Sequence, residues 1–98
     1  MKQSCEAWLR AQFGDDQETI DAVYAEYVET VAGLRKELAE VRVSDDATSL
    51  DRVLHTIKGT AAMAGDTELS EKAQAARGAA DTATLDALDA LMAELAVS

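Results

Sequence analysis

Apolar residues recur every three or four positions along most of this chain, and no proline interrupts the pattern. In the longest run, eight apolar side chains fall within about 60° of Tyr27 when successive residues are placed about 100° apart. They are Ile20, Val23, Tyr24, Tyr27, Val31, Leu34, Leu38 and Val41. This spacing predicts one long amphipathic helix with a single buried face.

Start and stop signals for a shorter helix precede this run. Ser4 is the predicted N-cap of that first helix, and Gly14 is placed to end it in a left-handed conformation. Asp15 and Glu18 then form a predicted capping box for the long second helix. The large apolar side chains of the first helix are Trp8, Leu9 and Phe13.

Three more helices are predicted after the long one. Residues 44–46 offer N-caps for a third helix, which Gly65 ends. Asp66 or Thr67 begins a fourth, and residues 78–82 contain its end and the next N-cap. The predicted buried positions of these three helices are Leu50, Val53, Leu54, Ile57, Ala61, Ala64, Leu69, Ala73, Ala76, Leu85, Leu88, Leu91, Met92 and Leu95.

The short connections between these helices restrict how they can pack. Connections of about 2 to 6 residues place consecutive helices antiparallel to each other. We therefore expect an all-α fold, an up-and-down antiparallel four-helix bundle with a short extra N-terminal helix across one end. With 98 residues and no linker-like segment, residues 1–98 are expected to form a single domain.

Charge and cysteine content exclude several classes of function. A net charge of −10 opposes binding to nucleic acid and to anionic membranes. No stretch approaches the roughly 20 apolar residues of a membrane span, and the start of the chain does not resemble a signal peptide. Cys5 is the single cysteine, so neither an intrachain disulfide nor a Cys-His zinc site is expected. These features favour a cytoplasmic protein without a metal.

The single histidine of the chain lies on the predicted third helix. If Ile57 marks the centre of the buried face, His55 lies about 160° away from it and points to solvent. An exposed imidazole can be incidental, or it can be a nucleophile presented to a partner.

Two neighbours of His55 bear on this choice. Lys58 follows three residues later, and its Cβ is expected about 5 to 6 Å from that of His55. Its ammonium could contact an anion held on the imidazole. Alternatively, it is an ordinary solvated charge. Gly59 lies on the same exposed face, where glycine costs roughly 1 kcal/mol relative to alanine. It gives clearance for a partner's backbone, or it is tolerated as Gly33 is in the second helix.

The run from His55 to Gly59, followed by Gly65 and Leu69, resembles the signature of histidine-containing phosphotransfer (HPt) domains of multistep phosphorelays. Residues 13–16 are similar to the first helix junction of that family, and the resemblance covers nearly the whole chain. Three places depart from the family pattern. They are Thr60, Met63 and the Ala-Ala-Arg of residues 75–77, where a leucine-glutamate ending is common.

The resemblance implies a phosphoryl carrier. His55 would accept the group from the aspartyl phosphate of a receiver domain, or from a sensor histidine kinase, and would pass it to a response-regulator receiver. Lys58 would offset phosphoryl charge, and Gly59 would give the receiver clearance. The receiver would bring Mg²⁺, and the carrier itself would need no cofactor. Separately from the resemblance, a closed bundle with a polar exterior is expected to be a monomer. Helical phase places the expected docking residues around His55 at Asp51, Arg52, Ala62 and Met63.

Other functions compete with this interpretation. The chain has no Walker loop and no room for an ATP-binding domain, so autokinase activity is not expected. The phosphoacceptor domain of a sensor kinase typically has an acidic residue directly after the histidine and a proline a few positions later. This chain has Thr56 directly after the histidine and contains no proline, so that interpretation is disfavoured. A phosphoacceptor domain cut from a chemotaxis-type kinase stays open, as does a helical module that binds a receiver without ever being phosphorylated.

Overall fold

A computed structural model describes residues 1–96 of the chain. The described part contains five α-helices and no strand. They are α1 (Gln3–Phe13), α2 (Gln17–Ser44), α3 (Ala47–Met63), α4 (Thr67–Gly78) and α5 (Thr82–Leu95). The predicted all-helical class is confirmed. None of these helices combines the length and the apolar character that crossing a membrane would require.

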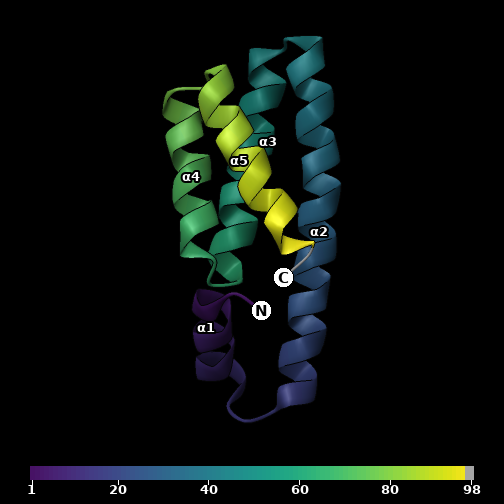
Figure 1. The fold of residues 1–98 in the computed structure, drawn as a ribbon, viewed down its shortest axis with the longest axis vertical. Coiled ribbons are helices and arrows are strands. Elements are labelled where there is room, and N and C mark those ends of the chain that lie inside the picture. The colour runs from purple at the N-terminus through teal and green to yellow at the C-terminus, as the bar shows by residue number, and fades with distance from the viewer. Residues whose placement is uncertain (97–98) are drawn as a thin grey trace.

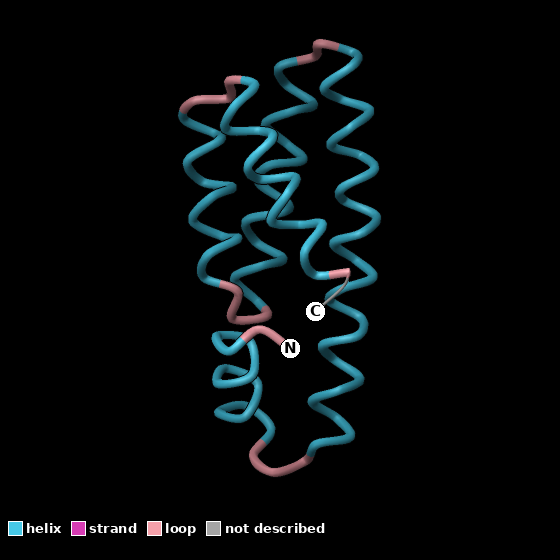
Figure 2. The backbone as a smooth tube through the Cα atoms, in the orientation of Figure 1, coloured by secondary structure: helices cyan, strands magenta, loops and turns pink. Residues whose placement is uncertain are grey.

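Helices α2 to α5 lie side by side, as Figures 1 and 2 show. Each packs against the next along the chain, and α5 returns to contact α2. Helix α2 is the longest, so its N-terminal part extends beyond the other three, and α1 runs alongside that part. The expectation that the N-terminal helix lies across one end is therefore wrong. The short α1–α2 connection instead folds α1 back along α2.

The buried face of α2 matches the sequence pattern. Its buried side chains all belong to the predicted stripe, and the remaining two members of that stripe, Val23 and Val41, are partly buried against the core. The buried residues are Ile20, Tyr24, Tyr27, Val31, Leu34 and Leu38. The leucines and Met92 of α5 face the same core. Burial of this stripe is the main driving force for helix association.

Aspartate side chains cap four of the five helices. Asp16, Asp46, Asp66 and Asp81 each accept a hydrogen bond from a backbone N–H two or three residues later. The predicted Asp15–Glu18 capping box is wrong, because Asp16 bonds the backbone N–H and the hydroxyl of Thr19. The ends predicted at two glycines are confirmed by positive φ angles, 64° at Gly14 and 73° at Gly65.

The start of α1 also differs from the prediction. Its N-cap is Lys2, which has an extended backbone and makes no side-chain cap, while Ser4 lies inside the helix. The reason is tertiary, since the ammonium of Lys2 pairs with Asp66 in the turn between α3 and α4. This contact keeps Lys2 against the rest of the molecule and lets the helix begin at Gln3.

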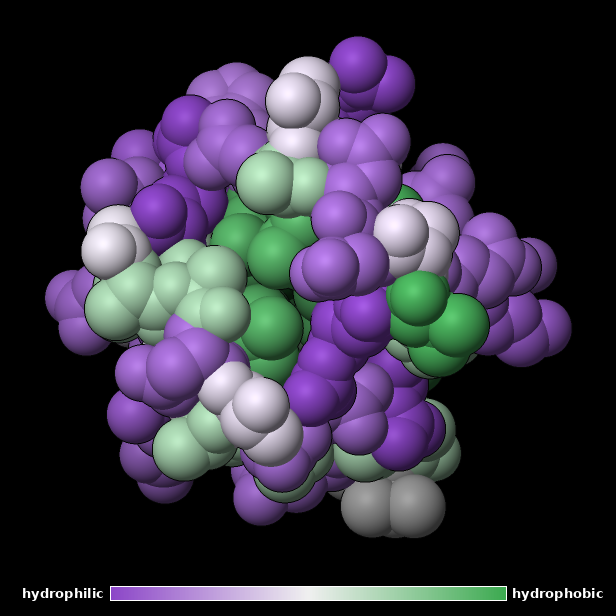
Figure 3. Space-filling view, turned by 90° about the horizontal axis from the view of Figure 1, so that it is seen from above, coloured by the Kyte–Doolittle hydropathy of each residue, from purple (hydrophilic) through white to green (hydrophobic). Residues whose placement is uncertain are grey.

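One end of the molecule carries the α2–α3 and α4–α5 connections. Viewed from that end, apolar side chains are visible in a hollow surrounded by polar ones (Figure 3). A pocket there is lined by Val41, Leu50 and Leu85, among others. Val41 and Leu50 are only partly buried, so the core is less completely covered at this end than in the middle.

Candidate functional site

Helix α3 presents His55 to solvent. Asp46 caps the helix, and the neighbouring Val53, Leu54 and Ile57 are buried against the other helices. His55 falls on the opposite face and is exposed, as the helical phase predicts. The packing of its neighbours therefore holds the backbone beneath the imidazole while the ring itself stays accessible.

An arginine from the next helix contacts the imidazole. Arg77, near the end of α4, places Nη1 3.0 Å from Nδ1 of His55. The same guanidinium forms an ion pair with Asp51, with Nε 3.0 Å from Oδ1 and Nη2 3.3 Å from Oδ2. Asp51 precedes His55 by one helical turn on α3. The structure thus joins three side chains from two helices into one polar cluster.

The arginine also sets the charge of this cluster. Its hydrogen bond holds the pKa of Asp51 below the usual aspartate value, and the charges of Arg77 and His55 act in the same direction. Asp51 is therefore an anion at neutral pH. The side chain of Arg77 is 29% exposed and that of Asp51 is 56% exposed, so water screens the pair and its geometry can rearrange.

Lys58 and Gly59 lie on the turn that follows the histidine. Lys58 is half-buried, and its backbone carbonyl accepts a hydrogen bond from Ser70 on α4 at 3.3 Å. No ion pair involves its ammonium within residues 1–96. Gly59 is exposed, and a Cβ added there would meet nothing within 4 Å. Packing inside the protein therefore does not require glycine at this position.

The other four predicted site residues are exposed along the same helix. Asp51, Arg52, Ala62 and Met63 are all accessible, and Met63, at the end of α3, is 76% exposed. Only Asp51 is joined to His55, through Arg77. Ala62 lies beside Trp8 of α1 in a surface hollow. Their expected part in docking stays a prediction.

Sequence reasoning missed Arg77 as a member of the site. The helical phase of α3 places Asp51 and His55 on one face, but it does not show which part of α4 lies beside them. Arg77 did stand out as a departure from the family pattern at residues 75–77, and that departure was the available signal. A basic residue there reaches back to α3 because α4 packs directly against it.

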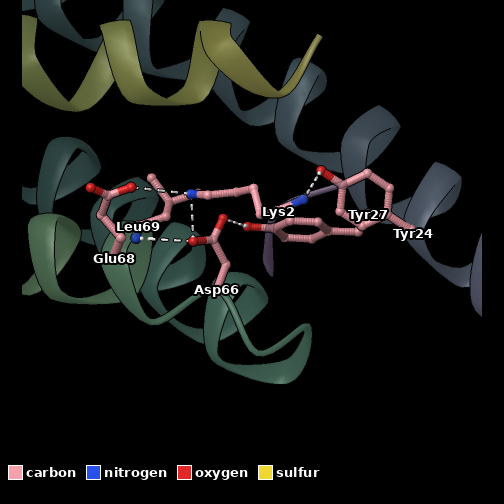
Figure 4. A network of polar contacts seen from close by, with 6 residues as sticks. All are labelled: Lys2, Tyr24, Tyr27, Asp66, Glu68 and Leu69. Carbon is pink, nitrogen blue, oxygen red and sulfur yellow. Dashed lines mark hydrogen bonds and ion pairs between the residues drawn. The ribbon is translucent and has the colours of Figure 1, made fainter. Parts of the chain in front are cut away.

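A second polar cluster lies at the opposite end of α3, under the turn that leads to α4 (Figure 4). Asp66 is completely buried there and accepts hydrogen bonds from Lys2 Nζ at 2.7 Å, the Tyr27 hydroxyl at 2.7 Å and the Leu69 backbone N–H at 3.3 Å. Its partners come from the N-terminus, α2 and α4. The cluster therefore fastens the start of α1 to the end of α3.

Burial and pairing shift the titration of this second cluster. Burial raises the pKa of the Tyr27 hydroxyl far above its usual value, and the bond to Asp66 adds to the shift. For Lys2, burial alone would lower the pKa, but the hydrogen bond and charge of Asp66 outweigh it and the pKa rises. Tyr27 thus stays neutral and Lys2 stays charged near neutral pH. The cluster is suited to a structural role.

Gly65 adds a steric contact to the same junction. A Cβ on Gly65 would clash with the side chain of Trp8 on α1, and its φ of 73° also favours glycine.

Within residues 1–96, no group of His, Cys, Asp or Glu side chains is arranged to hold a metal ion.

The comparisons with known proteins add one positive result. A protein-family model described as "Hpt domain" matches residues 7–97, nearly the whole chain. No curated protein and no solved structure matches the sequence.

Proposed function

Since the chain belongs to the Hpt domain family, which implies histidine phosphotransfer in two-component signalling, we propose that His55 is its phosphoryl acceptor. His55 would take the group from a receiver-domain aspartyl phosphate or from a sensor histidine kinase, and would pass it to a response-regulator receiver. The observation that carries this proposal is the exposure of the single histidine on α3 beside a basic side chain.

The transfer step uses a lone pair of the neutral imidazole. Nδ1 of His55 faces Arg77, and within residues 1–96 no polar contact reaches Nε2, so Nε2 is the nitrogen open to an incoming donor and would attack once it carries no proton. A P–N bond forms as the P–O bond of the aspartyl phosphate breaks, and the receiver carboxylate leaves with the electron pair. The reverse reaction delivers the group to a second receiver.

Charge and clearance around His55 support this chemistry. Phosphoryl transfer depends mainly on positioning and on stabilising charge over the phosphoryl oxygens. Lys58 and Arg77 would supply positive charge, and Mg²⁺ in the receiver would supply more. The open space beside Gly59 would admit the loops of the receiver. The protein would then be a carrier without ATP-binding or autokinase activity of its own.

We also infer that α2 to α5 form an antiparallel up-and-down four-helix bundle, with α1 as the extra helix. The short connections and the contact that α5 makes with α2 support this arrangement. The polar exterior supports a monomer. The partners would be receiver domains and a kinase, and neither nucleic acid nor membrane, given the net charge of −10.

The test is transfer from receiver domains phosphorylated in vitro on their aspartate. Wild-type protein should acquire acid-labile phosphate, and His55→Gln should acquire none. Because His55 is exposed, this substitution should change the free energy of unfolding by no more than about 0.5 kcal/mol. Lys36→Gln on the exposed face of α2 is the control and should accept phosphate normally. Labelling of His55→Gln would contradict the proposal, and binding without labelling of the wild type would favour a non-phosphorylated module.

A further inference from the structure

The contact between Arg77 and His55 restricts where the imidazole can carry its proton. A guanidinium has N–H donors and no acceptor, and it stays charged in proteins. At 3.0 Å from Nη1 of Arg77, Nδ1 of His55 must therefore be the acceptor, with its lone pair directed at the arginine. In the neutral ring the single proton then lies on Nε2.

This tautomer leaves the ring without a free lone pair. Nε2 carries the proton, and the lone pair of Nδ1 is occupied by Arg77. A nucleophile needs an available lone pair, so the imidazole in this arrangement cannot attack phosphorus at either nitrogen. If Arg77 only neutralised the charge of a phosphoryl group, it would not need to contact Nδ1 of His55.

We propose that Arg77 is a positioning residue that holds His55 in an unreactive tautomer at rest and frees it when a phosphoryl group arrives. This inference rests on the function proposed above. A phosphoryl group offers Arg77 several charged oxygens in place of one neutral nitrogen, and a guanidinium commonly binds phosphate through two parallel N–H···O bonds. The approaching donor would thus draw the guanidinium away from the ring.

Asp51 provides the partner that the ring needs once Arg77 has moved. It lies one turn before His55 on the same face of α3, and it is already bonded to Arg77. When the ring proton passes through solvent from Nε2 to Nδ1, the Asp51 carboxylate can accept the new Nδ1–H. The Nε2 lone pair then forms the P–N bond. Nδ1 keeps its proton, and Asp51 offsets the positive charge of the ring until that proton passes to solvent.

The exposure of these side chains allows such an exchange. Both members of the Arg77–Asp51 pair reach solvent, and exposed ion pairs are weak. By contrast, a buried pair such as Lys2–Asp66 would resist rearrangement, because Asp66 has no contact with water. The cluster at His55 is therefore held in a preferred geometry without being locked in it.

The first experiment reads the tautomer directly by ¹⁵N NMR. His55 is the single histidine, so histidine-labelled protein gives one pair of ring nitrogens. At a pH where the ring is neutral, wild-type protein should be mainly the Nε2–H form. Arg77→Gln offers an amide oxygen that accepts from Nδ1–H, and should move the tautomer ratio toward Nδ1–H by about two- to tenfold. Arg35→Gln is the control, because it removes an equal charge from an exposed α2–α5 ion pair and should leave the ratio unchanged.

The second experiment measures nucleophilicity without phosphate. Diethyl pyrocarbonate is uncharged and acylates a ring nitrogen with a free lone pair, releasing carbon dioxide and ethanol. At the same pH, Arg77→Gln should react about two- to tenfold faster than wild type, and Arg35→Gln at the wild-type rate. Circular dichroism checks that each variant is folded.

Two results would overturn the inference. One is a wild-type ring that is mainly Nδ1–H. The other is an Arg77→Gln variant whose tautomer ratio and acylation rate match those of Arg35→Gln. Neither measurement involves phosphate or a receiver. A failure of phosphoryl transfer to His55 would therefore refute the proposed function. The role of Arg77 in setting the tautomer would still be decided by the NMR and acylation measurements.

Discussion

Single residues around His55 contribute to the site in different ways. Arg77 contacts the ring, Asp51 holds Arg77, and Lys58 and Gly59 shape the turn that follows. None of the four is needed to fill the core. Substitutions at these positions should therefore change chemistry far more than they change stability, and each can be tested without unfolding the protein.

Lys58 offers a test of charge at the site. We expect Lys58→Ala to slow phosphoryl transfer by roughly fivefold, because removing one partly screened charge weakens attraction to the phosphoryl group by on the order of 1 kcal/mol. The unfolding transition should hardly move. Lys72→Ala removes an exposed lysine of α4 and serves as the control in the same transfer assay. Equal transfer rates for the two variants would mean that Lys58 is an ordinary solvated charge with no part in transfer.

Gly59 offers a test of clearance. Gly59→Ala should stabilise the protein by about 0.5 to 1 kcal/mol, because alanine is the better helix former and its Cβ meets nothing within 4 Å. It should also slow transfer by crowding the receiver. Gly33→Ala, on α2, is the control, because Gly33 is also an exposed glycine inside a helix whose added Cβ would enter open space. Denaturant unfolding and transfer kinetics on both variants separate the two effects, and unchanged transfer by Gly59→Ala would rule out the clearance role.

At the scale of the elements, one buried carboxylate links the start of α1 to α2 and α4. Asp66 caps α4, pairs with Lys2 and accepts from Tyr27 (Figure 4). Cys5, on α1, is fully buried beside it, and burial raises the pKa of its thiol. Leu9 of α1 is also fully buried in the core, and Trp8 lies close to Gly65.

We expect Asp66→Ala to lower the free energy of unfolding by about 3 kcal/mol, because it removes a helix cap and leaves the buried hydroxyl of Tyr27 without its acceptor. Asp81→Ala removes a cap of the same kind from α5 and nothing buried, so its loss should be much smaller. Denaturant unfolding measures both. Equal losses would mean that the Lys2 and Tyr27 contacts add no stability.

At the scale of the whole molecule, like charges oppose folding. The chain has 19 acidic and 9 basic residues. The interhelical pairs Arg35–Asp89 and Arg42–Asp86 join α2 to α5, but exposed pairs of this kind contribute little. Repulsion among the surplus carboxylates should therefore outweigh them in the salt dependence of stability.

Raising NaCl from about 0.01 M to about 0.15 M shortens the Debye length from about 30 Å to about 8 Å. We expect the free energy of unfolding to rise over this range, because screening weakens the repulsion more than it weakens the few exposed ion pairs. Thermal and denaturant unfolding at each salt concentration measure the effect. A steady fall in stability would show that the α2–α5 ion pairs dominate instead.

Local patterns in the sequence determined which helices form and which faces they bury. The α2 stripe and the exposure of His55 follow from a periodicity of 3.6 residues, which needs no knowledge of the neighbouring helices. The start of α4 at Asp66 or Thr67, the start of α5 within residues 78–82 and the ends at Gly14 and Gly65 are equally local. The family signature is local too, because it lies within α3, the turn that follows it and the first turn of α4.

The tertiary structure decided every contact between residues distant in the chain. His55 and Arg77 are 22 residues apart in the sequence, and Lys2 and Asp66 are 64 residues apart. The rotation and register of the packed helices bring each pair together. Helical phase within one segment cannot supply that register, since it depends on how two surfaces fit together. The sequence therefore determined that His55 would face solvent, but only the packing of α4 against α3 decided that an arginine would direct its proton.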